Sequence, residues 1–321
     1  MKRSAPYVCD REAVVKSPGS IANLGPGFDV LAVALSGLHD LVHVKASPGN
    51  GVVRVYSDIP VLAGSSNNAY AVAVKSLEKF KWLSSCDIEI YVRKGVPVSV
   101  GLGSSGATAA GAAFALSLIA GSVDEETVLG LAGEGERFVS GVAHYDNVAA
   151  SLLGGVVIVD TKYKKAYKIE VPREIRVGVV IPETGVRTER KTAFARSVLP
   201  GKIDLETHVQ QSSSLAKLVY GLIKGDLRLV GKTISEDEVC EPSRSKLIPF
   251  YKEIKEVALR EGAYGFNIAG AGPSVFYIHE DLDEINRIGG VILDFLRSKG
   301  VKASFLASSF SNRGVEVVAS G

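Results

Sequence analysis

Hydrophobic and polar positions along the chain follow two periods, one typical of strands and one typical of helices. Polar and apolar residues alternate at 52–57 and 87–93, and a β-branched run covers 155–160, so we predict strands there. Apolar residues three and four apart predict helices at 67–80 and 107–120. The second half adds predicted helices at about 206–224, 226–235, 247–261 and 281–299, and strands at 176–181, 265–268, 274–278, 302–307 and 315–319. Mixed strands and helices in both halves predict an α+β architecture.

Two local signals divide this pattern further. Ser122 followed by Glu125 has the spacing of a capping box, which predicts a helix opening there and running to about residue 139. Residues 161–174 are rich in Lys, Tyr and Pro, and we place a domain boundary near them.

The composition is that of a globular protein with balanced charge. Of 321 residues, 46% are hydrophobic, and 37 basic against 35 acidic residues leave a net charge of +2. A nucleic-acid-binding surface needs a clear basic excess, so we expect no nucleic-acid partner. The start of the chain has no apolar segment typical of a signal peptide, and the most apolar stretch, 107–120, is too short to span a bilayer. We therefore expect a cytoplasmic protein without a membrane segment.

The three cysteines, Cys9, Cys86 and Cys240, are far apart in the sequence. They form no C-x-x-C pair and no Cys/His spacing typical of zinc ligands. We expect three free thiols in a reducing compartment rather than a disulfide framework.

Glycine is the one unusual component, with 34 residues that cluster near 19–27, 95–111 and 262–272. The central cluster contains the segment P-V-S-V-G-L-G-S-S-G at residues 97–106, which we call the glycine loop. It lies between a predicted strand and a predicted helix, so several backbone amides and a helix N-terminus meet at one point. Such a point is an anion site suited to phosphate. The serine hydroxyls of the loop could bind phosphate oxygens or Mg²⁺.

Other interpretations of the glycine loop remain open. Gly101, Gly103 and Gly106 satisfy the dinucleotide-binding pattern G-x-G-x-x-G, but the acidic residue at the expected distance, Asp124, lies at a helix start instead of after a strand. Residues 225–233 miss the Walker A spacing by one position. A plain strand-to-helix turn without a ligand is the remaining alternative.

The glycine loop resembles the phosphate loop of the GHMP kinases, which include galactokinases, homoserine kinases, mevalonate kinases and phosphomevalonate kinases. Two more segments agree in the family's order: residues 18–29 (P-G-S-I-A-N-L-G-P-G-F-D) resemble the N-terminal motif and residues 270–274 (G-A-G-P-S) the C-terminal glycine motif. Three spaced motifs are far more specific than one.

Four segments resemble the homoserine kinases within that family. Residues 22–29 replace the Gly-Glu-His element of the mevalonate and galactose branches, and H-Y-D-N-V-A at 144–149 is similar to H-x-D-N-V-A. T-A-F-A-R at 192–196 and E-P-S-R at 241–244 resemble two further motifs. The likeness extends from about residue 14 to 319. It departs at Ala150, where a proline is common, and at 184–191, which look a few residues longer.

The resemblance implies the two-domain GHMP kinase fold. The N-terminal nucleotide-binding domain would resemble ribosomal protein S5 and cover residues 1–165. The C-terminal domain would be ferredoxin-like and cover 166–321. Activity on L-homoserine with ATP and Mg²⁺ would make O-phospho-L-homoserine for threonine biosynthesis, and the family suggests a homodimer.

The resemblance also implies the site residues. For the substrate these are Asn23, Asp29, His144, Asn147, Thr192, Arg196 and Arg244, of which Asp29 and Asn147 would be catalytic. Arginine suits the substrate carboxylate because its guanidinium binds in bidentate geometry. For Mg²⁺ they are Ser105 and Glu136. For ATP they are Asn68, Pro97, Val98, Ser99, Val100, Gly101, Leu102, Gly103, Ser104, Ser105, Gly106 and Gly272.

Each of these residues also has a purely structural interpretation. Asn23 and Asp29 could form the turn around 25–27, the arginines could be solvated surface charges, and Glu136 could be one charge on a helix face. Three other functions compete at the level of the chain: a GHMP kinase for another small alcohol such as mevalonate or shikimate, a catalytically silent binding protein of this fold, and an oxidoreductase that uses the G-x-G-x-x-G pattern.

Overall fold

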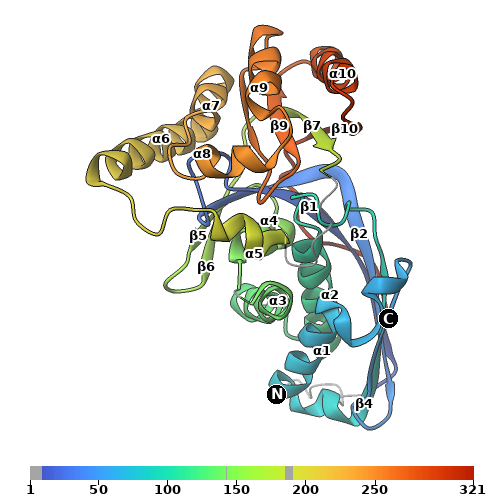
Figure 1. The fold of residues 1–321 in the computed structure, drawn as a ribbon. Coiled ribbons are helices and arrows are strands. Elements are labelled where there is room, and N and C mark those ends of the chain that lie inside the picture. Colours follow the sequence, from blue (N-terminus) through green and yellow to red (C-terminus); the bar gives the residue numbers. More distant parts are fainter. Residues whose placement is uncertain (1–8, 142, 185–190) are drawn as a thin grey trace.

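The computed structural model describes residues 9–141, 143–184 and 191–321, and Figure 1 shows the arrangement of their helices and strands. In these ranges the chain forms two sheets with helices packed on them. The first sheet has seven strands: β1 (Arg11–Ala22), β2 (Leu31–Pro48), β3 (Val53–Ser57), β4 (Cys86–Arg93), β5 (Val156–Asp160), β6 (Lys165–Ile169) and β11 (Glu316–Ser320). The second has four: β7 (Arg176–Pro182), β8 (Gly265–Ile268), β9 (Val275–His279) and β10 (Ala303–Ser309).

The first sheet is built around β1 and β2, which pair antiparallel over most of their length. Its main path is β11-β1-β2-β4-β3, and β5 and β6 extend it from β2. Four helices lie on one face, as the lower half of Figure 1 shows: α1 (Asn68–Lys79), α2 (Ser104–Ala120), α3 (Glu125–Ser140) and α4 (Tyr145–Leu153). Alanine-rich α2 packs directly on β1 because its small side chains and glycines allow close approach; a Cβ at Gly111 would lie 2.9 Å from Val42.

The second sheet is fully antiparallel in the order β10-β7-β9-β8. The remaining helices belong to this part of the chain: α5 (Lys191–Ser197), α6 (Leu205–Lys224), α7 (Leu227–Ile234), α8 (Glu241–Arg244), α9 (Tyr251–Arg260) and α10 (Leu282–Ser298). One hydrophobic core is shared by both sheets. It joins Ile21, Leu24 and Leu31 of the first part to Val177 and Phe276 of the second, which fixes the two parts against each other.

The pattern-based prediction of the elements is confirmed where the period is regular, as in β3, β4, α1 and α10. It assigned no strand to β1 or β2. The inner half of β1 is buried between neighbours and includes Ser17, Pro18 and Ser20, and β2 contains Gly37 and the buried Asp40, so neither shows a plain alternation. Helices α4, α5 and α8 are short and were also not assigned.

One local prediction needs correction. The cap of α3 is Asp124, whose carboxylate accepts from the Thr127 amide at 2.8 Å; Ser122 instead contacts Asp124.

The domain boundary at 165/166 stays a prediction. Strand β6 begins at Lys165 and pairs with β5, and β11 pairs with β1, so both of these later strands belong to the first sheet.

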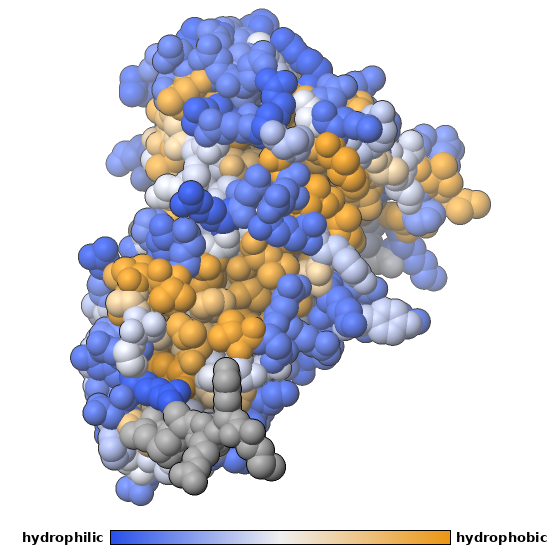
Figure 2. All heavy atoms as spheres, turned by 180° about the vertical axis from the view of Figure 1, so that it is seen from behind, coloured by the Kyte–Doolittle hydropathy of each residue, from blue (hydrophilic) through white to orange (hydrophobic). Residues whose placement is uncertain are grey.

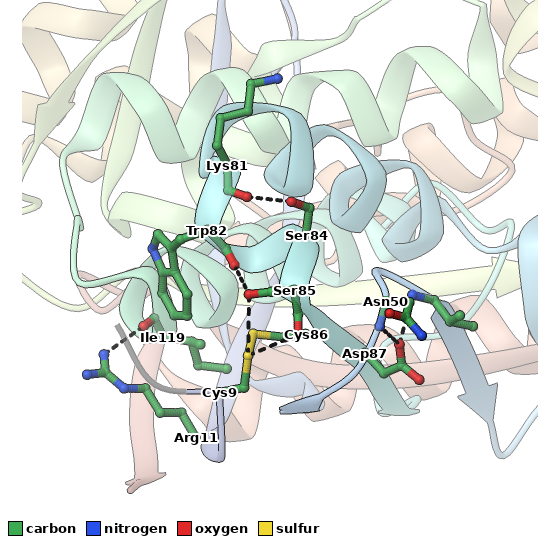
Figure 3. The surroundings of a disulfide bond; sticks show 11 residues. Cys9, Arg11, Asn50, Lys81, Trp82, Ser84, Ser85, Cys86, Asp87 and Ile119 are labelled. Atoms are coloured by element: carbon green, nitrogen blue, oxygen red, sulfur yellow. Dashed lines mark hydrogen bonds between the residues drawn. A yellow bond between two sulfur atoms is a disulfide. The ribbon is translucent and has the colours of Figure 1, made fainter. Parts of the chain in front are cut away.

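The expectation of three free thiols is wrong. Cys9 and Cys86 form a disulfide with a Cα–Cα distance of 5.6 Å, and only Cys240 is a free, buried thiol (Figure 3). The bridge forms because β1 and β4 both pair with the same end of β2: Ala46 pairs with Arg11 on one side and Ile88 on the other. The two cysteines are 77 residues apart, so their spacing in the sequence does not predict the bond.

On the rear face, shown in Figure 2, hydrophobic residues gather over the middle and hydrophilic residues surround them. Among the described helices, none has the length and apolar character required to cross a membrane.

Candidate active site

The glycine loop connects β4 to α2 through a backbone that requires glycine at two places. Gly101 and Gly103 have φ angles of +91° and +65°, and Gly103 is the residue immediately before the helix. A Cβ on Gly101 would lie 2.2 Å from the Ala269 carbonyl oxygen, and one on Gly103 would lie 2.0 Å from Ser20 Oγ. The loop therefore takes this path only without side chains at these positions.

The N-terminus of α2 presents amides that no helical carbonyl can satisfy, which favours an anion there. Ser104 Oγ donates to the Val96 carbonyl at 3.0 Å, so this hydroxyl supports the loop from below. Ser105 is tied to the start of α1, since Asn68 Nδ2 donates to its carbonyl at 2.8 Å. Ser105 and Asn68, which the sequence analysis assigned to Mg²⁺ and ATP, are therefore in contact.

The three sequence motifs meet at the glycine loop. The Ser274 amide donates to the Val100 carbonyl at 3.2 Å, which joins the C-terminal glycine turn to the loop. Asn23 Nδ2 donates to the Gly270 carbonyl at 3.1 Å, which joins the N-terminal motif to the same turn. Segments more than 240 residues apart along the chain therefore form one assembly.

A cavity of about 570 Å³ opens over this assembly. Most of the site residues predicted from the sequence line it: Asn23, Asp29, Asn68, Val98, Ser99, Gly101, Gly103, Ser104, Ser105, Glu136, His144, Asn147, Arg196, Arg244 and Gly272. Amides of the glycine loop and the two arginines thus share one space, as a site for a nucleotide beside a small anionic substrate would require.

Four predicted ATP residues do not line the cavity: Pro97, Val100, Leu102 and Gly106. Leu102 is fully buried and contributes to the shared core instead, and Gly106 packs against Asn147, where a Cβ would lie 3.0 Å from that residue's Cβ. Thr192 belongs to α5, but its side chain lies outside the described part of the structure. Most of the longer segment 184–191 also lies outside the described residues.

Two arginines frame the substrate end of the cavity. Arg196 makes a bidentate ion pair with Asp29, with Nη1–Oδ1 and Nη2–Oδ2 distances of 3.3 and 2.6 Å, and its Nη1 is also 3.3 Å from His144 Nε2. Both guanidinium groups lie near the ring of Phe28, with central carbons 5.3 Å (Arg196) and 5.1 Å (Arg244) from its centroid. Aromatic faces attract such cations, so Phe28 allows two like charges to stay close together.

Arg244 is the more buried of the two, with 5% of its surface exposed. Its Nε donates to the Ala195 carbonyl at 3.1 Å and its Nη1 to the Gly270 carbonyl at 2.9 Å. It forms no ion pair with a carboxylate of the described residues, and burial lowers its pKa. A buried guanidinium held only by carbonyls favours an incoming anion such as a carboxylate.

Two buried carboxylates, Glu136 and Asp146, also line the cavity. Burial raises the pKa of Glu136, while contact with the Ser105 hydroxyl and the charge of His144 oppose the shift. Burial likewise raises the pKa of Asp146. Asp146 Oδ1 accepts from the Asn147 amide at 2.7 Å and from Asn147 Nδ2 at 3.3 Å. A cation in the cavity would stabilise the ionised forms.

The asparagines of the predicted site already have protein partners. Asn147 Oδ1 accepts from Ser20 Oγ at 2.9 Å, and Asn23 Oδ1 accepts from the Asp29 amide at 3.2 Å. Asn23 also has a φ of +74°, as expected for a turn residue. Both side chains therefore line the cavity and also hold neighbouring segments of its wall together.

The cavity includes residues that the sequence prediction missed, among them Phe28, Val61, Lys94, Val139 and Asp146. Phe28 and Asp146 lie next to predicted residues inside the quoted motifs. Their position beside Asp29 and Asn147 could have marked them as further lining residues. Val61 and Val139 are exposed valines from distant segments, 76% and 51% accessible, and nothing local marks them. Together with Val98 they form an apolar edge suited to a planar base.

Comparison with known proteins gives a consistent result. Residues 67–155 match the model described as GHMP kinases N terminal domain, and residues 218–305 match GHMP kinases C terminal. The chain is 36% identical to a homoserine kinase of Thermoplasma volcanium over 96% of this chain and 97% of the relative. It is 38% identical to a homoserine kinase of Methanopyrus kandleri over 88% and 92%. A crystal structure of homoserine kinase from Cytophaga hutchinsonii superposes with a TM-score of 0.85 at 31% identity, covering 96% and 97%.

Proposed function

The chain belongs to the GHMP kinases, and from that membership we propose that it transfers the γ-phosphoryl group of ATP to the side-chain hydroxyl of L-homoserine. The product is O-phospho-L-homoserine, an intermediate of threonine biosynthesis. The predicted two-domain GHMP kinase fold is confirmed by the family matches and the superposition.

One observation carries the choice of substrate: two arginines line the same cavity as the glycine loop. Homoserine has a carboxylate that needs a fixed cation and a hydroxyl a few bonds away. Arg244, buried and without a carboxylate partner among the described residues, supplies the cation. Relatives at 33–38% identity that carry the name homoserine kinase support the same choice.

The remaining polar groups suit the rest of the substrate. Asp29 accepts two bonds from Arg196 and so orients this arginine as the second carboxylate ligand. The α-amino group needs acceptors, and Asp29 and Asn147 line the same end of the cavity. Both are also the proposed catalytic residues, as groups that would hold the hydroxyl in line with the transferred phosphorus.

The residues around Ser105 fit a magnesium ion. Glu136 is a desolvated carboxylate in contact with the Ser105 hydroxyl, and hard oxygen donors of this kind suit Mg²⁺. No cluster of three or more His, Cys, Asp or Glu side chains occurs in the described ranges, so the nucleotide would supply further ligands. When bound, Mg²⁺ would neutralise phosphate charge, and the amides at the start of α2 would hold the phosphates.

A coupled assay of ADP release tests the proposal, with homoserine, mevalonate, shikimate and galactose as acceptors. We expect turnover with homoserine alone. Turnover with mevalonate or shikimate alone would favour the other GHMP branch, and ATP binding without turnover on any acceptor would favour a silent binding protein. We further propose a cytoplasmic homodimer, for which sedimentation equilibrium gives the stoichiometry.

A further inference from the structure

A buried carboxylate lies beneath the glycine loop and contacts the chain on both sides of it. Asp40 belongs to β2 and is fully buried. Its Oδ1 accepts from the amides of Gly95 and Val96, each at 3.1 Å, immediately before the loop. Its Oδ2 accepts from Thr108 Oγ1 at 2.8 Å, in the second turn of α2, immediately after the loop.

Lys94 completes this arrangement. Its ammonium forms an ion pair with Asp40 Oδ2 and also donates to the Ser104 carbonyl at 2.9 Å and to Thr108 Oγ1 at 2.8 Å. An ammonium has three protons, so these three acceptors use all of them. The side chain is 6% exposed, and it lines the cavity from below. Asp40 and Lys94 thus connect β2 to the first helical residue of α2.

The loop between these fixed ends is irregular, because residues 97–103 form no helix or strand. Two of its carbonyls are also held by other parts of the chain: Leu102 accepts from the Ser20 amide at 3.0 Å and Val100 from the Ser274 amide at 3.2 Å. Fixing both ends of such a segment at a set distance reduces the number of conformations that it can adopt. Four donors converge on Asp40, and a carboxylate has lone pairs for all of them.

We infer that Asp40 is a positioning residue for the kinase reaction: it fixes the two ends of the glycine loop against β2, and so sets where the α2 amides meet the nucleotide phosphates. The inference rests on the proposed function, because it assumes that the loop holds phosphates. Asp40 itself does not line the cavity.

Asp40→Asn tests this with almost no change in shape. Asparagine offers fewer lone pairs and turns one NH₂ donor toward Lys94 or the loop amides. We expect the KM for ATP to rise about 10- to 100-fold, because small misplacements of binding groups have effects of that size. The KM for homoserine should stay within about twofold, because the arginines do not contact Asp40. Calorimetry with Mg·ADP should show the same loss of nucleotide affinity.

Thr108→Val provides a second, milder variant. It leaves the Asp40–Lys94 ion pair and the bond from Lys94 to the Ser104 carbonyl in place, and removes the hydroxyl through which both side chains contact the second turn of α2. We expect the KM for ATP to rise in this variant too, but by less than in Asp40→Asn. If Asp40→Asn does not fold, Thr108→Val decides the question.

Asp87→Asn is the matched control. Asp87 Oδ1 also accepts from two backbone amides, those of Asn50 at 2.9 Å and Val52 at 3.1 Å, but it holds a turn that does not line the cavity. This variant should leave both KM values unchanged. The inference is overturned if folded Asp40→Asn binds Mg·ADP as the unchanged protein does, or if both KM values rise equally. Since the calorimetry uses no acceptor, it reports on the loop even if the acceptor proves not to be homoserine.

Discussion

At the scale of single residues, the site depends on where two guanidinium groups are held. Asp29 holds Arg196 and main-chain carbonyls hold Arg244, and both guanidinium groups lie near the Phe28 ring. The two arginines differ in burial, and we expect them to bind the substrate differently. Arg244 is fixed in advance, whereas the side chain of Arg196 is 40% exposed and free to adjust when a substrate enters.

Replacing Arg196 by alanine should weaken homoserine binding and leave ATP binding nearly intact. A charge-assisted contact contributes roughly 1.5–3 kcal/mol, so we expect the KM for homoserine to rise about 10- to 100-fold in steady-state kinetics. Arg196→Lys should give an intermediate value, because lysine keeps the charge and loses the bidentate fork. Arg297→Ala, which removes an exposed arginine paired with Asp294, is the control. An equal rise in both KM values would contradict the assignment of Arg196.

Gly101→Ala and Gly121→Ala separate backbone strain from steric conflict. Both glycines have positive φ, +91° and +77°, so each alanine should lower the free energy of unfolding by about 1 kcal/mol. A Cβ at 101 would meet the Ala269 carbonyl oxygen at 2.2 Å, whereas one at 121 would meet nothing within 4 Å. We expect only Gly101→Ala to weaken ATP binding. Unchanged nucleotide affinity in a folded Gly101→Ala protein would show that the loop tolerates displacement.

At the scale of elements, helix ends rather than helix interiors join the site together. The N-termini of α2 and α4 and the C-terminal end of α8 all reach the cavity, through Ser104, His144 and Arg244. The helices that support them are fixed by caps. Asp124 caps α3, the helix that carries Glu136, and its bond from the Thr127 amide holds the pKa of its carboxyl below the usual value.

The Asp124 cap should make α3 sensitive to acid. Because the pKa is lowered in the folded state, the stabilisation is present above about pH 4 and is lost as the pH falls through the folded value. Asp124→Ala should lower the free energy of unfolding by about 1 kcal/mol near neutral pH, with a smaller difference in acid. Asp124→Asn should keep the cap without the pH dependence. Urea denaturation at about pH 7 and about pH 3 would measure both, and identical acid dependence in all three proteins would refute the prediction.

At the scale of the whole molecule, a disulfide and a strand pairing link segments of the first sheet that are far apart in the sequence. The Cys9–Cys86 bridge fixes the start of β1, and β11 adds the C-terminus to the other side of that strand, where Lys16 and Glu316 form an ion pair at 2.9 Å. In Figure 3 the bridge lies beside Trp82 and Ser85, at the end of β2 where β1 and β4 both pair with it. Neither cysteine lines the cavity, so the bridge concerns stability and not catalysis.

Removing the bridge should therefore lower stability and leave the kinetics unchanged. A cross-link that closes a loop of 77 residues should contribute about 4 kcal/mol through the entropy of the unfolded chain. We expect Cys9→Ala to lower the free energy of unfolding by up to that amount in guanidinium denaturation. Dithiothreitol should bring the unchanged protein to the level of the variant and should not alter the variant. Equal denaturation midpoints without reductant would contradict a stabilising bridge.

The sequence by itself determined the features that depend on neighbouring residues. Regular periods located β3, β4, α1 and α10, because one face of each is buried along its length. The glycine loop was evident because Gly101 and Gly103 take a backbone conformation that favours glycine. The motif residues could be assigned to one site because their order and spacing resemble a family.

The tertiary structure alone decided the features that join distant parts of the chain. Strands β1 and β2 are defined by their partners on both sides, and the disulfide exists because two strands share one end of β2. Likewise, only folding brings Asp40 to the ends of the glycine loop and Phe28 near two arginines. Local patterns record which face of a segment is buried, but not which segment buries it. That choice is made by packing and pairing between residues tens to hundreds of positions apart.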